Sequence, residues 1–152
     1  MPKAIPEGYH SLTPYLIFKD AAAAIEFYKR ALGATELYRM PAPGGKIGHA
    51  ELQIGDSRLM LADEAPDWGA LSARTVGGTP VTLHLYSEDV DALADRFVKA
   101  GGKVLRAVQN QFYGDRSGQF EDPEGYKGNL SQHVEDVPME EMERRMANMA
   151  GP

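Results

Sequence analysis

His49 and Glu51 are the residues of this chain whose types and spacing point most directly to chemistry. They lie two positions apart in a run that alternates polar and apolar residues, and side chains two apart on a β-strand share one face of the sheet. An imidazole beside a carboxylate can act as a general base with an orienting or acidic neighbour. The alternative is structural, in which His49 and Glu51 hydrogen-bond to each other on a polar, half-solvated sheet face.

A second polar group, Tyr113, Asp115 and Arg116, lies in a glycine-containing turn before the last expected hairpin. The Arg116 guanidinium could bind an anionic ligand through its paired N–H donors. It could equally form an ion pair with Asp115 that holds the loop. The residue types leave both interpretations open.

Three aromatic residues could form the walls of a site for a planar or partly apolar molecule. Trp68, the only tryptophan, lies in a long loop beside Pro66. There it could cover an apolar ligand by stacking, or it could close the edge of the core. Tyr15 and Phe112 could add further aromatic surface.

The composition restricts the classes of function. The chain has 152 residues, with 16 Lys and Arg against 22 Asp and Glu, a formal net charge of −6 and no Cys. Without Cys there is no disulfide scaffold, iron–sulfur cluster, thiolate zinc site or cysteine nucleophile. No segment resembles a signal peptide, none approaches the ~20 apolar residues of a membrane span, and no basic cluster fits nucleic acid. We therefore expect a cytoplasmic protein with no nucleic-acid or membrane partner, whose partner is a small molecule or its own copy.

The elements that must position these residues occur twice in the sequence. An extended run that ends at Asp20 precedes a helical pattern that ends at Gly33, and the same order recurs from Asp89 to Gly102, 69 residues later. Asp is a favourable residue before a helix, and Gly is a favourable residue after one. A pattern repeated at one offset indicates an internal duplication.

Three strand-like runs follow each helix, so the sequence predicts an α+β fold of two tandem βαβββ modules. These runs are expected at 35–39, 47–54 and 57–61, and again at 103–108, about 118–121 and 127–133. We place the first module at residues 9–63, a linker at 64–79, the second module at 80–135 and a C-terminal helical tail at 136–152, all within one structural domain.

The tail carries four methionines at helical spacing: Met139, Met142, Met146 and Met149. Such a stripe could be an adaptable binding surface. The simpler interpretation is a helix that packs on its own domain or on a partner subunit.

The modules and their motifs resemble the vicinal-oxygen-chelate superfamily, which includes glyoxalase I, extradiol dioxygenases, and bleomycin and fosfomycin resistance proteins. The resemblance spans about residues 9–135, and Ile25–Gly33 is similar to the first-helix signature of that superfamily. It implies a cupped, barrel-like mixed sheet around one ligand cavity, and a homodimer. The segments that resemble the PhnB-like branch are His49–Leu61, Tyr113–Arg116, Asp122–Gly125 and His133–Asp136.

Enzymes of that superfamily hold a divalent metal in the cup with four His or Glu side chains. Alignment from the helix signatures and the Asp122 turn places those positions at Thr13, Met60, Thr82 and Asn129. Hydroxyl, thioether and amide groups do not replace imidazole and carboxylate at a nickel, zinc or iron site. We therefore expect no metal cofactor at the usual place, with His49, Glu51 and His84 as the residues that could hold a relocated divalent metal.

Strand alternation adds candidates for the wall of the cup. His84 and His133 lie on the mixed polar faces, where they either contact a ligand or are satisfied polar residues. The full set of expected ligand-binding residues is Thr13, Tyr15, Met60, Trp68, Thr82, His84, Phe112, Arg116, Asn129 and Ser131, with His49 and Glu51 as catalytic candidates.

The function that these observations favour is binding of a small molecule in the cup between the modules. Sequestration, as in bleomycin-type resistance proteins, is one mode that the resemblance implies. The alternative is a lyase, isomerase or other enzyme that uses His49 and Glu51 for acid–base chemistry or a relocated metal. A third class is a structural or interaction role that uses the methionine-rich tail.

Overall fold

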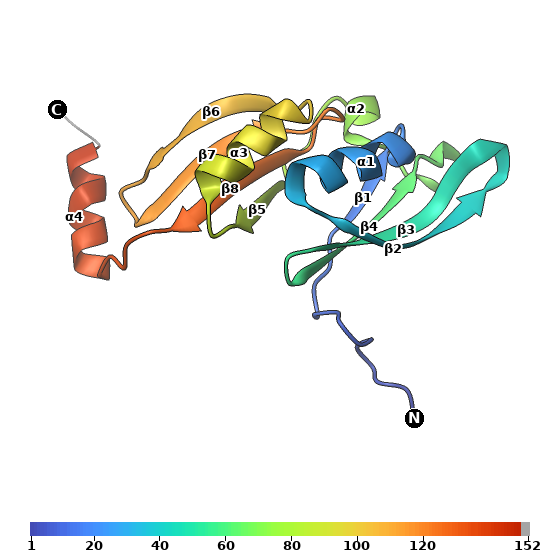
Figure 1. Cartoon of the computed structure of the whole chain (residues 1–152), viewed down its shortest axis with the longest axis horizontal. Coiled ribbons are helices and arrows are strands. Elements are labelled where there is room, and N and C mark those ends of the chain that lie inside the picture. The colour runs from blue at the N-terminus through green and yellow to red at the C-terminus, as the bar shows by residue number, and fades with distance from the viewer. Residues whose placement is uncertain (150–152) are drawn as a thin grey trace.

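The computed structural model describes residues 1–149 and contains two four-stranded sheets, each with a helix packed on one face (Figure 1). This confirms the expected α+β fold of two tandem βαβββ modules with a C-terminal helix; residues 150–152 of the expected tail lie outside the described part. The first module consists of β1 (Tyr15–Phe18), α1 (Ala21–Leu32), β2 (Thr35–Ala42), η1 (Pro43–Gly45), β3 (Lys46–Ile54) and β4 (Ser57–Asp63). The second consists of β5 (Thr82–Tyr86), α3 (Val90–Lys99), β6 (Lys103–Asn110), β7 (Asp115–Glu121) and β8 (Lys127–His133); η2 (Pro66–Trp68) and α2 (Ala73–Val76) lie between the modules, and α4 (Met139–Met149) follows them.

Local sequence signals set the limits of the two long helices. The Asp20 carboxylate accepts a hydrogen bond from the Ala23 amide, and the Asp89 carboxylate accepts one from the Ala92 amide. Each aspartate therefore satisfies one of the unpaired N–H groups at a helix start. Gly33 ends α1 with a φ of 67°, a left-handed conformation that costs glycine little.

The strand register repeats along with the elements. The strand order is β1-β4-β3-β2 in the first sheet and β5-β8-β7-β6 in the second, and in each sheet the first strand runs parallel to its neighbour. Tyr15 pairs with Met60, and His84 pairs with Asn129. Since 84 − 15 and 129 − 60 are both 69, the offset seen in the sequence also relates the two registers.

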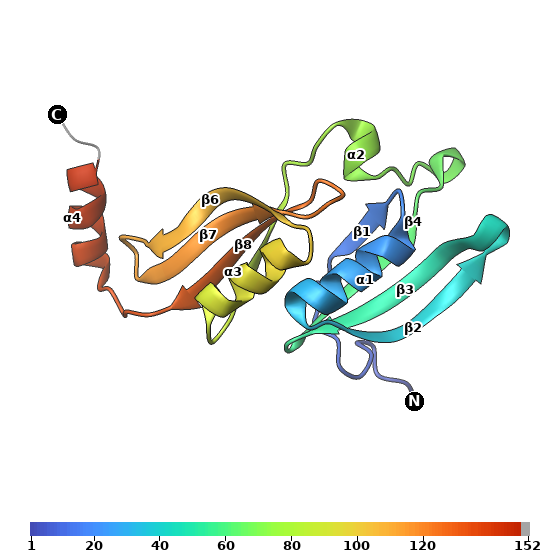
Figure 2. The same ribbon diagram turned by 45° about the horizontal axis from the view of Figure 1, so that its top comes forward.

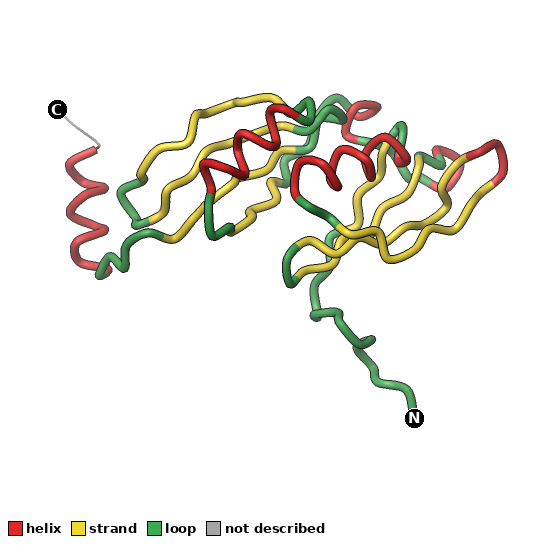
Figure 3. Tube along the Cα trace, viewed as in Figure 1, coloured by secondary structure: helices red, strands yellow, loops and turns green. Residues whose placement is uncertain are grey.

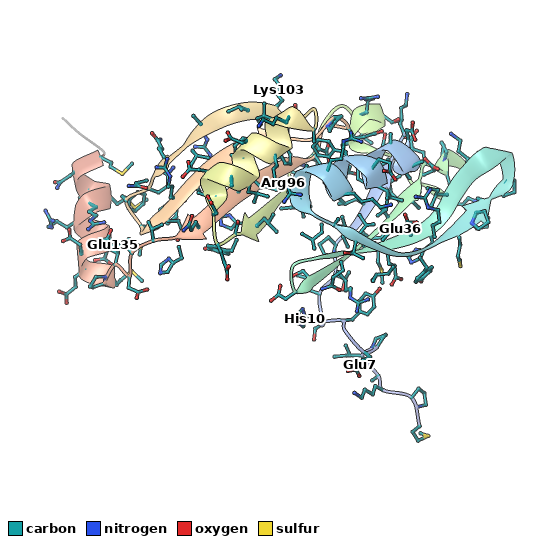
Figure 4. All side chains as sticks on the ribbon, viewed as in Figure 1. Glu7, His10, Glu36, Arg96, Lys103 and Glu135 are labelled. Atoms are coloured by element: carbon teal, nitrogen blue, oxygen red, sulfur yellow. The ribbon has the colours of Figure 1, made fainter. Side chains whose placement is uncertain are left out.

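The helices α1 and α3 lie side by side and join the two modules (Figure 2). The rings of Phe27 and Phe97 meet edge to face with centroids 5.1 Å apart. The Arg96 guanidinium donates to the Arg30 carbonyl at 3.2 Å, and Figure 4 shows Arg96 at this junction. The core is therefore continuous across the boundary between the modules.

The turn that joins β7 to β8 also binds the first module. The Glu124 carboxylate accepts hydrogen bonds from the Lys19 and Asp20 amides, each at 3.0 Å. The Tyr126 hydroxyl donates to the Ile17 carbonyl at 2.7 Å and accepts from the Ile17 amide at 3.3 Å. Because β1 is an edge strand with unpaired backbone groups, these contacts cover the edge and fix one module against the other.

Some boundaries differ from those expected. Strand β7 begins at Asp115, three residues before the expected run, because its ladder with β8 continues to the Asp115–His133 pair. Residues 1–14 form no helix or strand, as Figure 3 shows, and α4 stands at the far end of the second sheet. Among the described residues, no helix has both the length and the apolar character that a membrane crossing requires.

Candidate functional site

The face of the first sheet that α1 leaves uncovered carries a chain of hydrogen bonds. Tyr15 on β1, His49 and Glu51 on β3 and Tyr38 on β2 form it, because residues paired across strands share a face. The Tyr15 hydroxyl lies 2.8 Å from His49 Nδ1, and His49 Nε2 lies 2.7 Å from Glu51 Oε2. The Tyr38 hydroxyl donates to the same Glu51 oxygen at 2.8 Å. The structure thus brings the two catalytic candidates together with two tyrosines.

These linked hydrogen bonds have the form of a proton relay that ends at the exposed phenol of Tyr15. Glu51 is buried, whereas Tyr15 is 47% exposed. With the ring N–H of His49 directed to Glu51, Nδ1 accepts the hydrogen bond of the Tyr15 hydroxyl. Burial, and to a smaller extent Tyr38, raises the pKa of Tyr15 above its usual value, so Tyr15 remains a donor at neutral pH. The arrangement can move a proton between a molecule at Tyr15 and the His49–Glu51 pair.

A cavity of about 360 Å³ lies between the two modules. Three of the expected ligand-binding residues line it: Thr13 in the N-terminal segment, and Thr82 and His84 on β5. His49 and Glu51 do not line it. Apolar and aromatic side chains from both modules form much of the wall, among them Tyr28, Leu32, Leu83, Leu85, Phe97 and Leu130.

The second sheet carries its own polar cluster on the uncovered face. The Tyr86 hydroxyl donates to Asp115 at 2.9 Å, and His133 lies between Asp115 at 2.8 Å and Asp136 at 2.7 Å. Hydrogen bonds to Asp136 and then to Asp115 raise the pKa of His133 above its usual value. His133 therefore stays protonated, with both ring nitrogens donating, to a higher pH than a free imidazole.

A shallow hollow of about 580 Å³ separates this cluster from α4. Arg145 holds the helix there through the Phe112 carbonyl at 3.1 Å and the Glu135 carboxylate at 3.0 Å. The tail helix thus contacts its own second module. The hollow is lined by Phe112, His133 and the methionines Met139, Met142 and Met146, among others.

The remaining expected site residues lie in different places. Arg116 points to the face covered by α3, where its Nε and Nη2 donate to the two Asp91 oxygens, each at 3.0 Å. Trp68 is 89% exposed on η2 and lines neither cavity described above. Asn129 binds the His84 ring at 3.2 Å, and Ser131 is fully buried with its hydroxyl unpaired.

The two imidazoles proposed for a relocated metal lie on different sheets. His49 and Glu51 belong to β3 and His84 to β5, and the described residues contain no group of three His, Cys, Asp or Glu side chains arranged to hold a metal ion. The structure therefore does not bring His84 to the His49–Glu51 pair within one chain.

Three residues near these sites were not among the sequence candidates: Tyr38, Arg58 and Tyr126. Tyr38 could have been found from its pairing with Glu51, but bulges in β2 obscure that register. Arg58 shares a face with Met60, so strand alternation does indicate that it points the same way. Nothing in the local sequence places Tyr126 against Ile17, because that contact spans 109 residues.

One family model and several known proteins match most of this chain. The family model described as "Glyoxalase/Bleomycin resistance protein/Dioxygenase superfamily" matches residues 10–129. The uncharacterized protein Rv0887c of Mycobacterium tuberculosis is 42% identical over 141 residues, which cover 91% of this chain and 83% of that protein. The crystal structure of TioX from Micromonospora sp. ML1 has a TM-score of 0.67 at 26% identity, covering 82% of this chain and 99% of TioX. TnmS3, an antibiotic binding protein from Streptomyces sp. CB03234, has a TM-score of 0.63 at 25% identity, covering 87% of this chain and 99% of TnmS3.

Proposed function

The chain belongs to the glyoxalase/bleomycin resistance protein/dioxygenase superfamily, and from this premise we propose that it binds a small organic molecule in the cavity between its modules. The observation that carries the proposal is the cavity itself. Its volume of about 360 Å³ lies within the range of ligand pockets, and its apolar wall contains a few polar groups, among them Thr82 and His84. Fixed polar groups in an apolar wall orient a ligand and select it.

Two further observations support binding rather than metal-dependent catalysis. The similar structure TnmS3 is described as an antibiotic binding protein. The alignment made from the sequence places Thr13, Met60, Thr82 and Asn129 at the four metal-ligand positions that the resemblance implies, and the Asn129 amide is already hydrogen-bonded to His84. These donors do not fit a divalent transition metal. The motifs around His49 and Asp122 support a place in the PhnB-like branch.

The proposal includes a homodimer. The uncovered face of the first sheet exposes Tyr15, Tyr38 and Met40, and that of the second exposes Tyr86, each between 46% and 61%. Large aromatic and apolar side chains exposed on sheet faces favour an interface with another chain. A second copy that covers these faces would enclose the His49–Glu51 pair. We therefore expect the chain to sediment as a dimer.

Blocking the cavity is expected to abolish binding. Thr82→Trp places an indole in the cavity from an edge strand that tolerates aromatic residues. In a thermal-shift screen of small aromatic acids, amides and amines, compounds that stabilise the wild type should fail to stabilise Thr82→Trp. A ligand at 100 times its Kd adds ~2.7 kcal/mol to the free energy of unfolding, which such a screen detects.

The matched control is Thr82→Ser, which keeps the hydroxyl group, adds no bulk to the cavity and should keep the shifts. Urea unfolding of all three proteins shows whether each is folded. Compounds that stabilise Thr82→Trp as well as the wild type bind elsewhere, and that result would contradict the proposed site.

The second candidate function is acid–base catalysis at the Tyr15–His49–Glu51 relay. The specific observation in its favour is that both ring nitrogens of His49 are engaged, with a buried carboxylate on one side and an exposed phenol on the other. If the pair is catalytic, the wild type speeds the exchange of protons on the carbon next to a ketone carbonyl. We expect Glu51→Gln to slow this exchange by at least 10²-fold, as loss of a general base typically does. NMR detection of deuterium incorporation into a panel of small ketones measures this rate. His133→Gln is the matched control and should exchange at the wild-type rate. If the wild type incorporates deuterium into none of the ketones faster than buffer alone does, this candidate function is eliminated.

A further inference from the structure

The wall of the inter-module cavity is unusually basic for a chain with a net charge of −6. Four of its lining residues carry basic side chains, His10, Arg58, His84 and Lys127, and only Asp122 is acidic. Asp122 is already engaged, because it accepts hydrogen bonds from the Tyr28 hydroxyl and from the Glu124 and Tyr126 amides. The basic groups therefore have no free acid opposite them within the cavity.

Arg58 is the clearest case of an uncompensated charge. Its guanidinium lies 4.9 Å from the centre of the Tyr9 ring, and its Nε is buried without a hydrogen-bond partner. Across residues 1–149 no carboxylate pairs with it. By contrast, Arg39, Arg116, Arg144 and Arg145 all form ion pairs with Asp or Glu.

The backbone is shaped to keep the Arg58 guanidinium at this place. Gly8 has a φ of 84°, a left-handed conformation that favours glycine, and it brings the N-terminal segment against the guanidinium, where a Cβ would lie 2.1 Å from an Arg58 nitrogen. The Tyr9 ring covers one side of the group by a cation–π contact. Stacking of this kind leaves the N–H groups at the edge of the guanidinium available for an acceptor.

Lys127 extends the positive potential along the wall, and His84 adds a polar ring nitrogen. Lys127 begins β8 opposite Thr82, and it makes no ion pair within the described chain. The His84 ring is bound at Nδ1 by Asn129, so the hydrogen bonds formed by the described residues leave Nε2 open. Low-dielectric walls lined with one sign of charge concentrate ligands of the opposite sign.

We propose that the ligand of this cavity is an amphipathic anion: an apolar, aromatic or branched body on the Leu and Phe wall, with a carboxylate or similar acidic group bound by Arg58. The inference rests on the proposed function and adds the chemical class of the ligand. A partly buried guanidinium with no protein partner gains charge-assisted hydrogen bonds from such a group.

A pair of probes that differ mainly in charge tests the inference. Naphthalene-1-acetate and naphthalene-1-acetamide share an apolar body, and calorimetric titration measures the Kd of each for the whole chain. We expect the acid to bind at least ten-fold more tightly than the amide, and to lose most of this preference at high ionic strength. Arg58→Gln should raise the Kd of the acid by about ten-fold and leave the Kd of the amide unchanged.

The matched control is Lys103→Gln, which changes the net charge equally at the start of β6. Lys103 does not line the cavity, and Figure 4 shows it on the opposite edge of the molecule from His10. This variant should bind both probes as the wild type does. Chemical-shift changes at the Thr82 and His84 amides locate each probe.

The possible results separate the inference from the proposed function. If the amide binds at Thr82 and His84 as tightly as the acid, the cavity is a binding site but its anion selectivity is refuted. If Lys103→Gln weakens the acid as much as Arg58→Gln does, the effect is one of net charge and the inference is again refuted. If neither probe binds or both bind elsewhere, the proposed cavity function is contradicted too.

Discussion

Replacing Phe97 by alanine is expected to lower the free energy of unfolding by about 3–5 kcal/mol, the usual cost of removing a buried phenyl ring. The Phe97 ring is 3% exposed. It meets Phe27 on α1 at 5.1 Å and Phe120 on β7 at 5.5 Å, both edge to face. One ring therefore links the core of the second module to the helix of the first. Urea unfolding followed by circular dichroism measures the change.

Two variants of α3 serve as controls for this prediction. Val98→Ala changes the next residue on the same helix, which is 44% exposed, and should cost less than about 1 kcal/mol. Phe97→Leu keeps most of the apolar volume and should cost less than alanine does. A loss below about 1 kcal/mol for Phe97→Ala would show that the aromatic contact between the modules does not support the fold.

The elements of this fold could be predicted from the sequence because their signals are local. Asp20 and Asp89 cap helices three residues before the amides that they bind, and Gly33 lies directly after the helix that it ends. These signals need no knowledge of the partner module. The offset of 69 residues then extended each assignment from one copy to the other.

The face on which Arg116 lies could not be predicted in the same way. The expected strand began at 118, which left Arg116 in a turn with no assigned direction. In the structure β7 includes Arg116 opposite Gln132, and this register directs the guanidinium to Asp91 on α3. An extension of three residues, set by pairing with β8, therefore decides between an ion pair and a ligand contact.

The cavity could be predicted only as a general location. Thr13, Thr82 and His84 line it, and Thr82 and His84 belong to the edge strand β5. Its exact wall depends on how the modules pack, which contacts such as Tyr126 with Ile17 determine across 109 residues. No periodicity specifies such a contact, so strand alternation could direct Arg58 to the face of Met60 but could not place its guanidinium in the wall of the cavity.

Removing the Tyr28 hydroxyl, which contacts Asp122 across the module boundary, is expected to lower the free energy of unfolding by an amount that depends on pH. Tyr28 and Asp122 are both buried, and the Tyr28 hydroxyl donates to the Asp122 carboxylate. A hydrogen bond to a charged acceptor contributes about 1.5–3 kcal/mol, so Tyr28→Phe should lower the free energy of unfolding by about 2–3 kcal/mol at neutral pH. Denaturant unfolding between about pH 7 and about pH 4 measures the loss.

The sign of the pH dependence follows from Asp122. Burial raises its pKa in the folded chain above the unfolded value, so the folded state favours the neutral acid and this contribution to stability is lost as the pH rises through the folded pKa. The Tyr28 hydrogen bond acts in the opposite direction, because it lowers that pKa and offsets part of the cost of burying the carboxylate. Burial and Asp122 raise the pKa of Tyr28 itself well above its usual value, so the hydroxyl stays a donor throughout. The cost of Tyr28→Phe should therefore be largest where Asp122 is ionised and should shrink as the pH falls through its pKa.

A double-mutant cycle separates this effect from simple loss of packing. In an Asp122→Asn background the acceptor carries no charge, so Tyr28→Phe should cost less and its cost should not change with pH. A pH-independent cost in both backgrounds would contradict the assignment.

Tyr28 and Asp122 also line the inter-module cavity. The hydrogen bond between them, which holds the two modules together, therefore also forms part of the wall that a ligand would meet. Stability of the module boundary and shape of the proposed site therefore depend on the same pair of side chains.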